Sequence, residues 1–194
     1  MTMQTLPWFV ARASGSVGWV LLTASVLWGL VMSTRARPLG HKPRPAWMLD
    51  LHRFLGGLAV IFTAVHVSTI LLDSFVHFDL SAVLVPFASS WHPVAVAWGI
   101  VAMYLLVAVE LTSLARRRLP RRAWRATHFA SFPLFASATV HGLSAGTDAG
   151  NLLFQGVAAG GVAAVAGLTA LRIHQSRQPA AVVIPIRERE RVAA

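Results

Sequence analysis

Stretches of about 20 residues with almost no charged side chain recur along this sequence, and each is long enough to cross the hydrocarbon core of a bilayer. Only 12% of the residues are charged, about half the share usual in a soluble domain. Backbone polar groups in lipid must bond within their own segment, which favours helices. We therefore predict an all-α fold, an integral membrane bundle of about five transmembrane helices, at residues 15–32, 51–72, 94–114, 126–145 and 152–171.

The basic residues predict how this bundle is oriented. The chain has 17 Lys and Arg and a net charge of +10, but all of them except Arg12 lie within residues 35–53, 116–125 and 172–191. These segments fall on one side of the predicted spans, so the charge indicates a cytoplasmic side and not a nucleic-acid surface. We predict an N-terminus outside, a cytoplasmic C-terminus, the lipid bilayer as a partner and no nucleic-acid partner.

The remaining segments are predicted to carry little chemistry. Residues 1–7 contain no basic residue, and Arg35 and Arg37 follow the first span, so we interpret that span as an uncleaved anchor. The outward segment 73–93 has an apolar stretch, interrupted by Pro86, that is too short to span, and we expect it at the interface or re-entering. Residues 172–194 are polar and are predicted to be a disordered cytoplasmic tail. The absence of cysteine excludes iron–sulfur clusters and thiolate-ligated metals.

Four histidines inside the predicted spans are the candidate site residues, because an ionisable group in lipid is costly unless it is used. His52 and His66 share the second span. Their separation of 14 residues corresponds to about 21 Å of helix and about 40° of rotation, so both face one groove at two depths. The alternative interpretation is that these histidines only pack.

The second pair, His128 and His141, lies in the fourth span. Thirteen residues rise about 19.5 Å but leave an ideal helix about 140° out of register. Pro133 lies between the two histidines and should kink the helix there. The sequence therefore matches the second pair to the first in depth and leaves its direction open.

The second and fourth spans run in the same direction, so His52 lies at the level of His128 near the cytoplasmic side, and His66 at the level of His141 near the outside. Two imidazoles at one depth can hold a haem iron axially. Zinc would need four ligands at one level, and a di-iron site would need inward carboxylates, whereas Glu110 is the only acid well inside a span. Small residues leave room for a macrocycle: Gly56, Gly57, Ala59 and Ala64, with Ala130, Ala136, Ser137 and Ala138 opposite.

Two arginines and three outer-loop residues have two interpretations each. Arg53 and Arg125 lie at the cytoplasmic ends of the histidine spans, where they either pair with haem propionates or simply extend to the interface. His77, Trp91 and His92 either border an acceptor site or are ordinary loop residues. No residue is predicted to be catalytic.

The stretches LHRFLGGLAVIFTAVH (residues 51–66) and RRAWRATHFASFPLFASATVHG (residues 121–142) resemble the ferric reductase and NADPH oxidase transmembrane family. The resemblance covers roughly residues 47–145 and implies a haem-binding domain over residues 1–171. It implies two haems b that pass electrons outward, an inner one on His52 and His128 and an outer one on His66 and His141.

Two departures from the family modify this expectation. The chain has five predicted spans where six are common, and only a short tail, residues 172–194, follows the last span. This resembles the separate dihaem subunits of bacterial inner membranes. We therefore expect a haem-containing oxidoreductase subunit without its own NAD(P)H or FAD domain.

The resulting hypothesis is transmembrane electron transfer. The donor would be a separate cytoplasmic flavoprotein reductase, and the acceptor ferric iron, oxygen or a periplasmic or extracellular redox protein. The alternatives are a dihaem quinol oxidoreductase subunit and a non-redox membrane anchor or assembly subunit.

Overall fold

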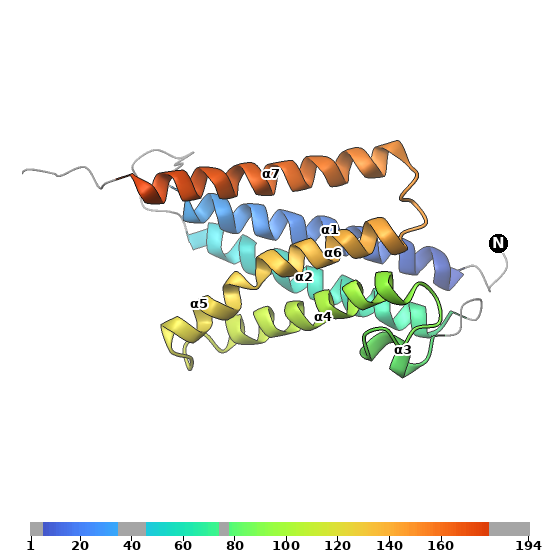
Figure 1. Ribbon diagram of the computed structural model, residues 1–194. Coiled ribbons are helices and arrows are strands. Elements are labelled where there is room, and N and C mark those ends of the chain that lie inside the picture. The colour runs from blue at the N-terminus through green and yellow to red at the C-terminus, as the bar shows by residue number, and fades with distance from the viewer. Residues whose placement is uncertain (1–5, 35–45, 74–77, 179–194) are drawn as a thin grey trace, which may run out of the picture.

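The chain forms an all-helical bundle whose long helices run side by side (Figure 1). The computed structural model describes residues 6–34, 46–73 and 78–178, and no strand occurs within them. The predicted tail beyond residue 178, His41 and His77 lie outside these ranges. The helices in order are α1 (Leu6–Ser33), α2 (Ala46–Leu71), α3 (Leu80–Leu84), α4 (Pro93–Leu114), α5 (Arg121–Phe129), α6 (Ser131–Ala145) and α7 (Leu152–Arg177).

Four helices, α1, α2, α4 and α7, are each long and apolar enough to cross a membrane. Many of their large apolar side chains are exposed, as expected where lipid replaces water. A small set of buried side chains joins them, including Leu22 of α1, Ala59 of α2, Leu106 of α4 and Leu134 of α6. The predicted membrane-spanning helical architecture is confirmed.

The predicted fourth span, residues 126–145, is divided into two helices. We expected a kink at Pro133, but the break lies at Ala130, between α5 and α6. Proline has no N–H to donate to the carbonyl four residues earlier and its ring crowds that carbonyl, but it is tolerated in a first helical turn. α5 therefore ends at Phe129, and Pro133 lies in the first turn of α6.

The outer segment that we expected at the interface contains the short helix α3, which stops at Leu84. Val85 has extended backbone angles (φ −107°, ψ 118°), the conformation favoured for a residue before proline. The carboxylate of Asp79 begins the helix by accepting the N–H of Ala82 at 2.7 Å. Tyr104 of α4 donates its hydroxyl to the Leu84 carbonyl, which ties α3 to the bundle.

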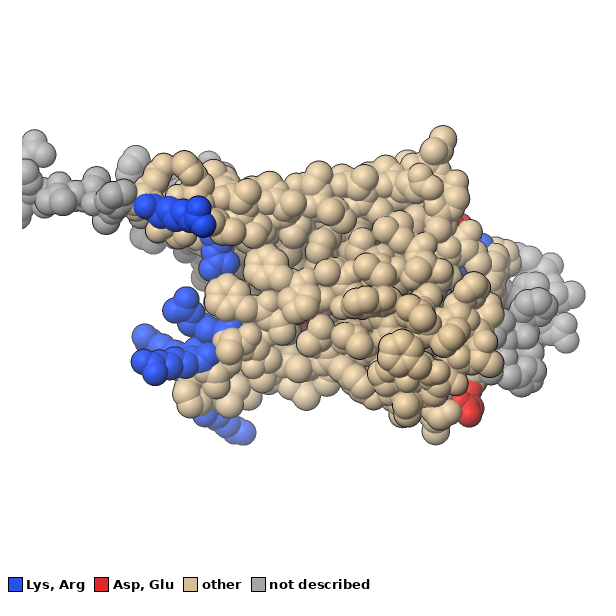
Figure 2. Space-filling view, in the orientation of Figure 1, with Lys and Arg blue, Asp and Glu red and all other residues tan. Residues whose placement is uncertain are grey.

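Charge separates to the two ends of the bundle. Figure 2 shows lysine and arginine gathered at the end that holds α5 and the C-terminal end of α7. Acidic side chains appear at the opposite end, where α3 lies. We call these the basic end and the acidic end. Their segregation is the pattern expected of a multi-pass membrane protein.

Candidate cofactor site

The four histidines form two pairs, one at each level of the bundle. The ring centroids of His52 on α2 and His128 on α5 are 6.0 Å apart, and those of His66 on α2 and His141 on α6 are 6.2 Å apart. We call these the inner pair and the outer pair. A single uniform helix would have turned His128 and His141 to different faces, but the helix is interrupted at Ala130. His128 therefore lies against His52, and His141 against His66, as predicted.

Three of the four imidazoles are hydrogen-bonded to a helix carbonyl through Nδ1. His66 bonds the carbonyl of Ala11 at 2.7 Å, and His52 bonds that of Ser25 at 3.1 Å. His141 bonds the carbonyl of Ala95 at 2.8 Å. A carbonyl only accepts, so each Nδ1 carries the proton and each Nε2 keeps its lone pair for a metal.

A glycine four residues after each of these carbonyls makes room for the ring. A Cβ added to Gly15 would lie 2.9 Å from Nδ1 of His66. The same addition would lie 2.7 Å from Cε1 of His141 at Gly99 and 3.2 Å from Cε1 of His52 at Gly29. Carbonyl and glycine together form what we call an imidazole seat, with seats at Ala11/Gly15, Ser25/Gly29 and Ala95/Gly99.

These seats were not predicted, although the sequence contains a signal for two of them. Gly15 and Gly29 are 14 residues apart, as are His52 and His66. α1 and α2 are antiparallel, so two glycines and two histidines with the same spacing lie opposite one another. A glycine on α1 therefore faces each histidine on α2. The small residue that we expected to make room, Gly56, instead faces the carboxylate of Glu110 on α4.

His128 is the exception among the four histidines. Its Nδ1 is buried and has no hydrogen-bond partner. The ring is stacked instead on the indole of Trp124, one helical turn earlier, at a centroid distance of 5.0 Å and an angle of 19°. The guanidinium of Arg116 covers the same indole at 4.6 Å. Stacking, rather than a hydrogen bond, orients this imidazole.

The two arginines singled out from the sequence lie at the basic end. Arg53 is exposed at 65% of its side chain and is 3.8 Å from the carboxylate of Asp50, one turn earlier. Arg125 is also exposed. Of the outer-loop residues, Trp91 borders the outer cavity described next. His92 is exposed and has a left-handed backbone (φ 42°) at the start of α4.

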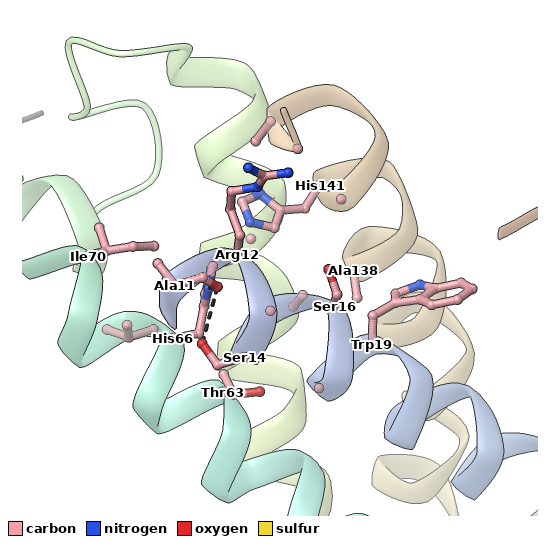
Figure 3. A pocket seen from close by; sticks show the side chains of 18 of the residues that line it. Ala11, Arg12, Ser14, Ser16, Trp19, Thr63, His66, Ile70, Ala138 and His141 are labelled. Carbon is pink, nitrogen blue, oxygen red and sulfur yellow. Dashed lines mark hydrogen bonds between the residues drawn. The ribbon is translucent and has the colours of Figure 1, made fainter. Parts of the chain in front are cut away.

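A cavity of about 300 Å³ surrounds the outer pair. Figure 3 shows His66 and His141 within it, with the hydrogen bond from His66 to Ala11. Ala59 and Ala138, two of the small residues expected to leave space, line its walls. Trp19 of α1 also lines it and donates its indole N–H to the hydroxyl of Thr139 at 3.0 Å. The cavity is mostly apolar and thus suited to a flat hydrophobic group.

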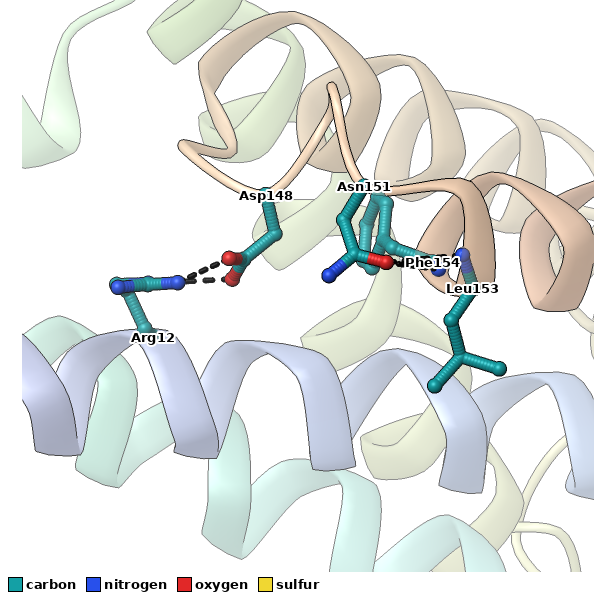
Figure 4. A network of polar contacts seen from close by, with 5 residues as sticks. All are labelled: Arg12, Asp148, Asn151, Leu153 and Phe154. Atoms are coloured by element: carbon teal, nitrogen blue, oxygen red, sulfur yellow. Dashed lines mark hydrogen bonds and ion pairs between the residues drawn. The ribbon is translucent and has the colours of Figure 1, made fainter.

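An ion pair borders this cavity at the acidic end. Arg12 of α1 forms a two-bond contact with Asp148 in the connection between α6 and α7 (Figure 4). The guanidinium also lies 4.2 Å from the ring centroid of Trp8. All three residues line the cavity. The only basic residue predicted on the outer side is therefore neutralised there.

Both pairs fit a metal held between two imidazoles. A His–metal bond of about 2.0 Å places the ring centroids of two axial imidazoles about 6.2 Å apart, and the observed separations are 6.0 and 6.2 Å. Within the described residues no group of three or more His, Cys, Asp or Glu converges on one point. Two ligands per level suit an iron whose other four positions are filled by a macrocycle, and they do not suit a closed zinc site.

Comparison with known proteins identifies the family of the chain. A family model described as "Ferric reductase like transmembrane component" matches residues 14–139. This range contains His52, His66 and His128 and ends two residues before His141. No curated protein matches the chain, and no solved structure does.

Proposed function

Because the chain belongs to the ferric reductase like transmembrane component family, we propose that it carries electrons across a membrane through two haems b. His52 and His128 would hold the inner haem, and His66 and His141 the outer one. When bound, each haem would supply an iron that gains and releases one electron. One observation carries the proposal. At each of two levels, two imidazoles have the ring-centroid separation expected for a single metal bound between them.

The protein's own residues account for the rest of the site. The three imidazole seats fix the tautomer that leaves Nε2 free to bind iron, and they increase the basicity of these ligands. The 14 residues between His52 and His66 separate the two levels by about 21 Å along α2. Two centres at these depths divide the crossing of the bilayer into shorter steps.

The arrangement of charge supports a direction for electron flow. By the positive-inside rule we propose that the basic end faces the cytoplasm, and that electrons enter there and leave at the acidic end. An arginine-rich surface attracts an acidic partner and speeds its encounter. We therefore propose a separate cytoplasmic flavoprotein as donor. The acceptor at the other side would be ferric iron, oxygen or a periplasmic redox protein.

The decisive experiment is a reduced-minus-oxidised spectrum with haem quantitation on the purified chain in detergent. We expect two low-spin haems b per chain, reduced by dithionite but not by NADPH until a flavin reductase is added. His66→Ala and His141→Ala should each remove the outer haem, and His52→Ala and His128→Ala the inner haem. A wild-type chain that binds no haem in haem-replete cells would contradict the proposal and favour an anchor or assembly role.

The crossing angle of the imidazole planes gives the same preparation a second signature. The rings cross at 79° in the inner pair and 77° in the outer pair. If the two imidazoles of a pair hold one iron at this crossing angle, two iron d orbitals would lie close in energy, which would make the ferric g tensor strongly anisotropic. Low-temperature EPR should show such signals from both centres, whereas parallel rings would give ordinary rhombic spectra.

A further inference from the structure

One acidic side chain inside the bundle has no part in the site described so far. Glu110 lies in α4, four residues before the helix ends, and its carboxylate is turned onto the backbone of α2. The carboxylate carbon is 3.3 Å from the place that a Cβ on Gly56 would take. Within the described residues this carboxylate has no hydrogen bond and no ion pair. An ionisable group in a membrane span is costly unless it is used.

The carboxylate lies beside the inner pair. His52 and Gly56 are four residues apart on α2, so their Cβ directions differ by about 40° and their levels by about 6 Å. Because the Glu110 carboxylate occupies the place of a side chain at Gly56, it lies one helical turn from His52 on the same face of α2. α4 also packs against α5, which carries His128. Glu110 thus belongs to a helix that contacts both helices of the inner pair.

No cation is fixed against this carboxylate by the helices that pack on α4. Arg53 is 65% exposed and is turned to Asp50, and Arg116, which follows α4, lies over the indole of Trp124. None of the ionisable residues on these helices forms an ion pair with Glu110 within the described part of the chain. They are Asp50, His52, Arg53 and His66 on α2, Arg121, Arg122, Arg125 and His128 on α5, and His141 on α6.

We propose that Glu110 is the proton acceptor of the inner centre. Its carboxylate takes up one proton from the cytoplasmic side when the inner iron is reduced, and it releases that proton when the electron moves to the outer iron. One electron from the donor converts ferric to ferrous iron, and one proton converts the carboxylate to the neutral acid, so the charge of the site is unchanged. The inference rests on the proposed function, because it assumes a haem on His52 and His128.

The physical reason is the repulsion between an added electron and a nearby carboxylate. This repulsion is stronger in apolar surroundings than in water, because little around the charges screens it. A proton on Glu110 removes it. Glu110 is about 6 Å along the helix from Leu114, where α4 ends at the basic end, so the proton has only about one turn to travel. At the outer level Asp148 is instead neutralised by Arg12.

The first test is a redox titration of the full chain at several pH values, monitored by absorbance and EPR. His141→Ala, which should retain the inner centre, and His128→Ala, which should retain the outer one, assign the two steps. We expect the inner potential to fall as pH rises. Glu110→Gln has nearly the same shape but cannot ionise, so it should reduce this dependence and leave the outer step as in the wild type.

The outcomes of this titration are distinguishable. An inner potential that does not vary with pH, or one that varies equally in Glu110→Gln, would overturn the inference. Absence of the inner haem from the wild type would instead contradict the proposed function. Asp50→Asn is the matched control, because Asp50 is an exposed acid near the same end of α2, and it should keep the full dependence of the wild type.

Infrared spectroscopy tests the proton directly. The reduced-minus-oxidised difference spectrum of the wild type should contain a band from a protonated carboxyl group that shifts in heavy water. The band should persist in Asp50→Asn and be absent from Glu110→Gln. If Glu110→Gln does not fold, isotope-labelled glutamate in the wild type replaces it, and the band should then shift. A spectrum without such a band, or a band that labelled glutamate leaves in place, would show that Glu110 does not take up the proton.

Discussion

At the outer level both imidazoles donate to helix carbonyls beside a glycine, whereas at the inner level only His52 does. The fourth imidazole, that of His128, is stacked on Trp124, and its Nδ1 has no partner. The two pairs nonetheless have nearly equal ring separations, 6.0 and 6.2 Å. Nearly equal ring spacing is thus obtained by two different means.

This difference distinguishes two effects on an imidazole: what holds the ring in position, and what changes the electron-donating strength of its nitrogen. A hydrogen bond fixes the ring and also changes its strength as a ligand, whereas stacking fixes the ring with little effect on the ring nitrogen. The packing around the three seats also differs. Gly99 and Gly15 hold their rings at closer range than Gly29 does. The outer pair is therefore the more tightly constrained, and substitutions should affect it more.

The largest effect is expected from filling the closest seat. Gly99→Ala places a methyl group 2.7 Å from two atoms of the His141 ring, and overpacking of this kind costs about 1–3 kcal/mol. We expect most of the outer haem to be lost and the inner haem to be kept, as measured by haem quantitation and EPR. Gly57→Ala is the matched control, because nothing lies within 4 Å of its added Cβ.

A graded effect is expected along α1. The Cβ of Gly15→Ala would lie 2.9 Å from the His66 ring, and that of Gly29→Ala 3.2 Å from the His52 ring. Gly15→Ala should therefore reduce outer haem occupancy more than Gly29→Ala reduces inner occupancy. Haem content per chain, measured in parallel preparations, checks the order. Greater loss from Gly29→Ala would mean that the inner pair is the more constrained, which reverses the comparison.

The smallest effect is a response to acid confined to the acidic end. The Ala82 N–H and the Ser81 hydroxyl stabilise the charged carboxylate of Asp79 and lower its pKa. A lowered folded pKa means that the cap is intact above the ordinary carboxyl pKa and is lost as pH falls through the lowered value.

Amide exchange at Ala82 should report this acid response, after correction for the intrinsic pH dependence of exchange. Its protection should fall in acid, while the inner haem spectrum stays unchanged. Asp79→Asn keeps a capping side chain without the titration, and its corrected protection should not vary with pH. An equal acid response in Asp79→Asn would assign the loss to another group.

The sequence was sufficient to predict the spans and the pairing of the histidines, because apolar length and matched spacing are local properties. It left the direction of His128 and His141 open, since an ideal helix turns them about 140° apart. Only the tertiary structure shows how the break at Ala130 resolves this. We placed the distortion at Pro133, which crowds the preceding turn, but the break occurs in that preceding turn itself.

The imidazole seats were less visible because each depends on two helices. A glycine in a transmembrane helix has many uses, and nothing local distinguishes Gly15 from Gly57. The shared step of 14 residues on α1 and α2 is the one signal that a register argument could have used. His128 has no seat of this kind, and its ring is stacked on Trp124 instead.

The imidazole seats also have a consequence for the order of assembly. α1 with α2 and α4 with α6 are the two most extensively packed helix pairs, and every seat lies within one of these pairs. Each half of the molecule can therefore present its histidines before the halves meet. α2 and α4 contact each other sparingly, so a group bound between the halves would act as a clamp. Synthesis runs from α1 to α6, so the two imidazoles of α2 enter the membrane before those of His128 and His141.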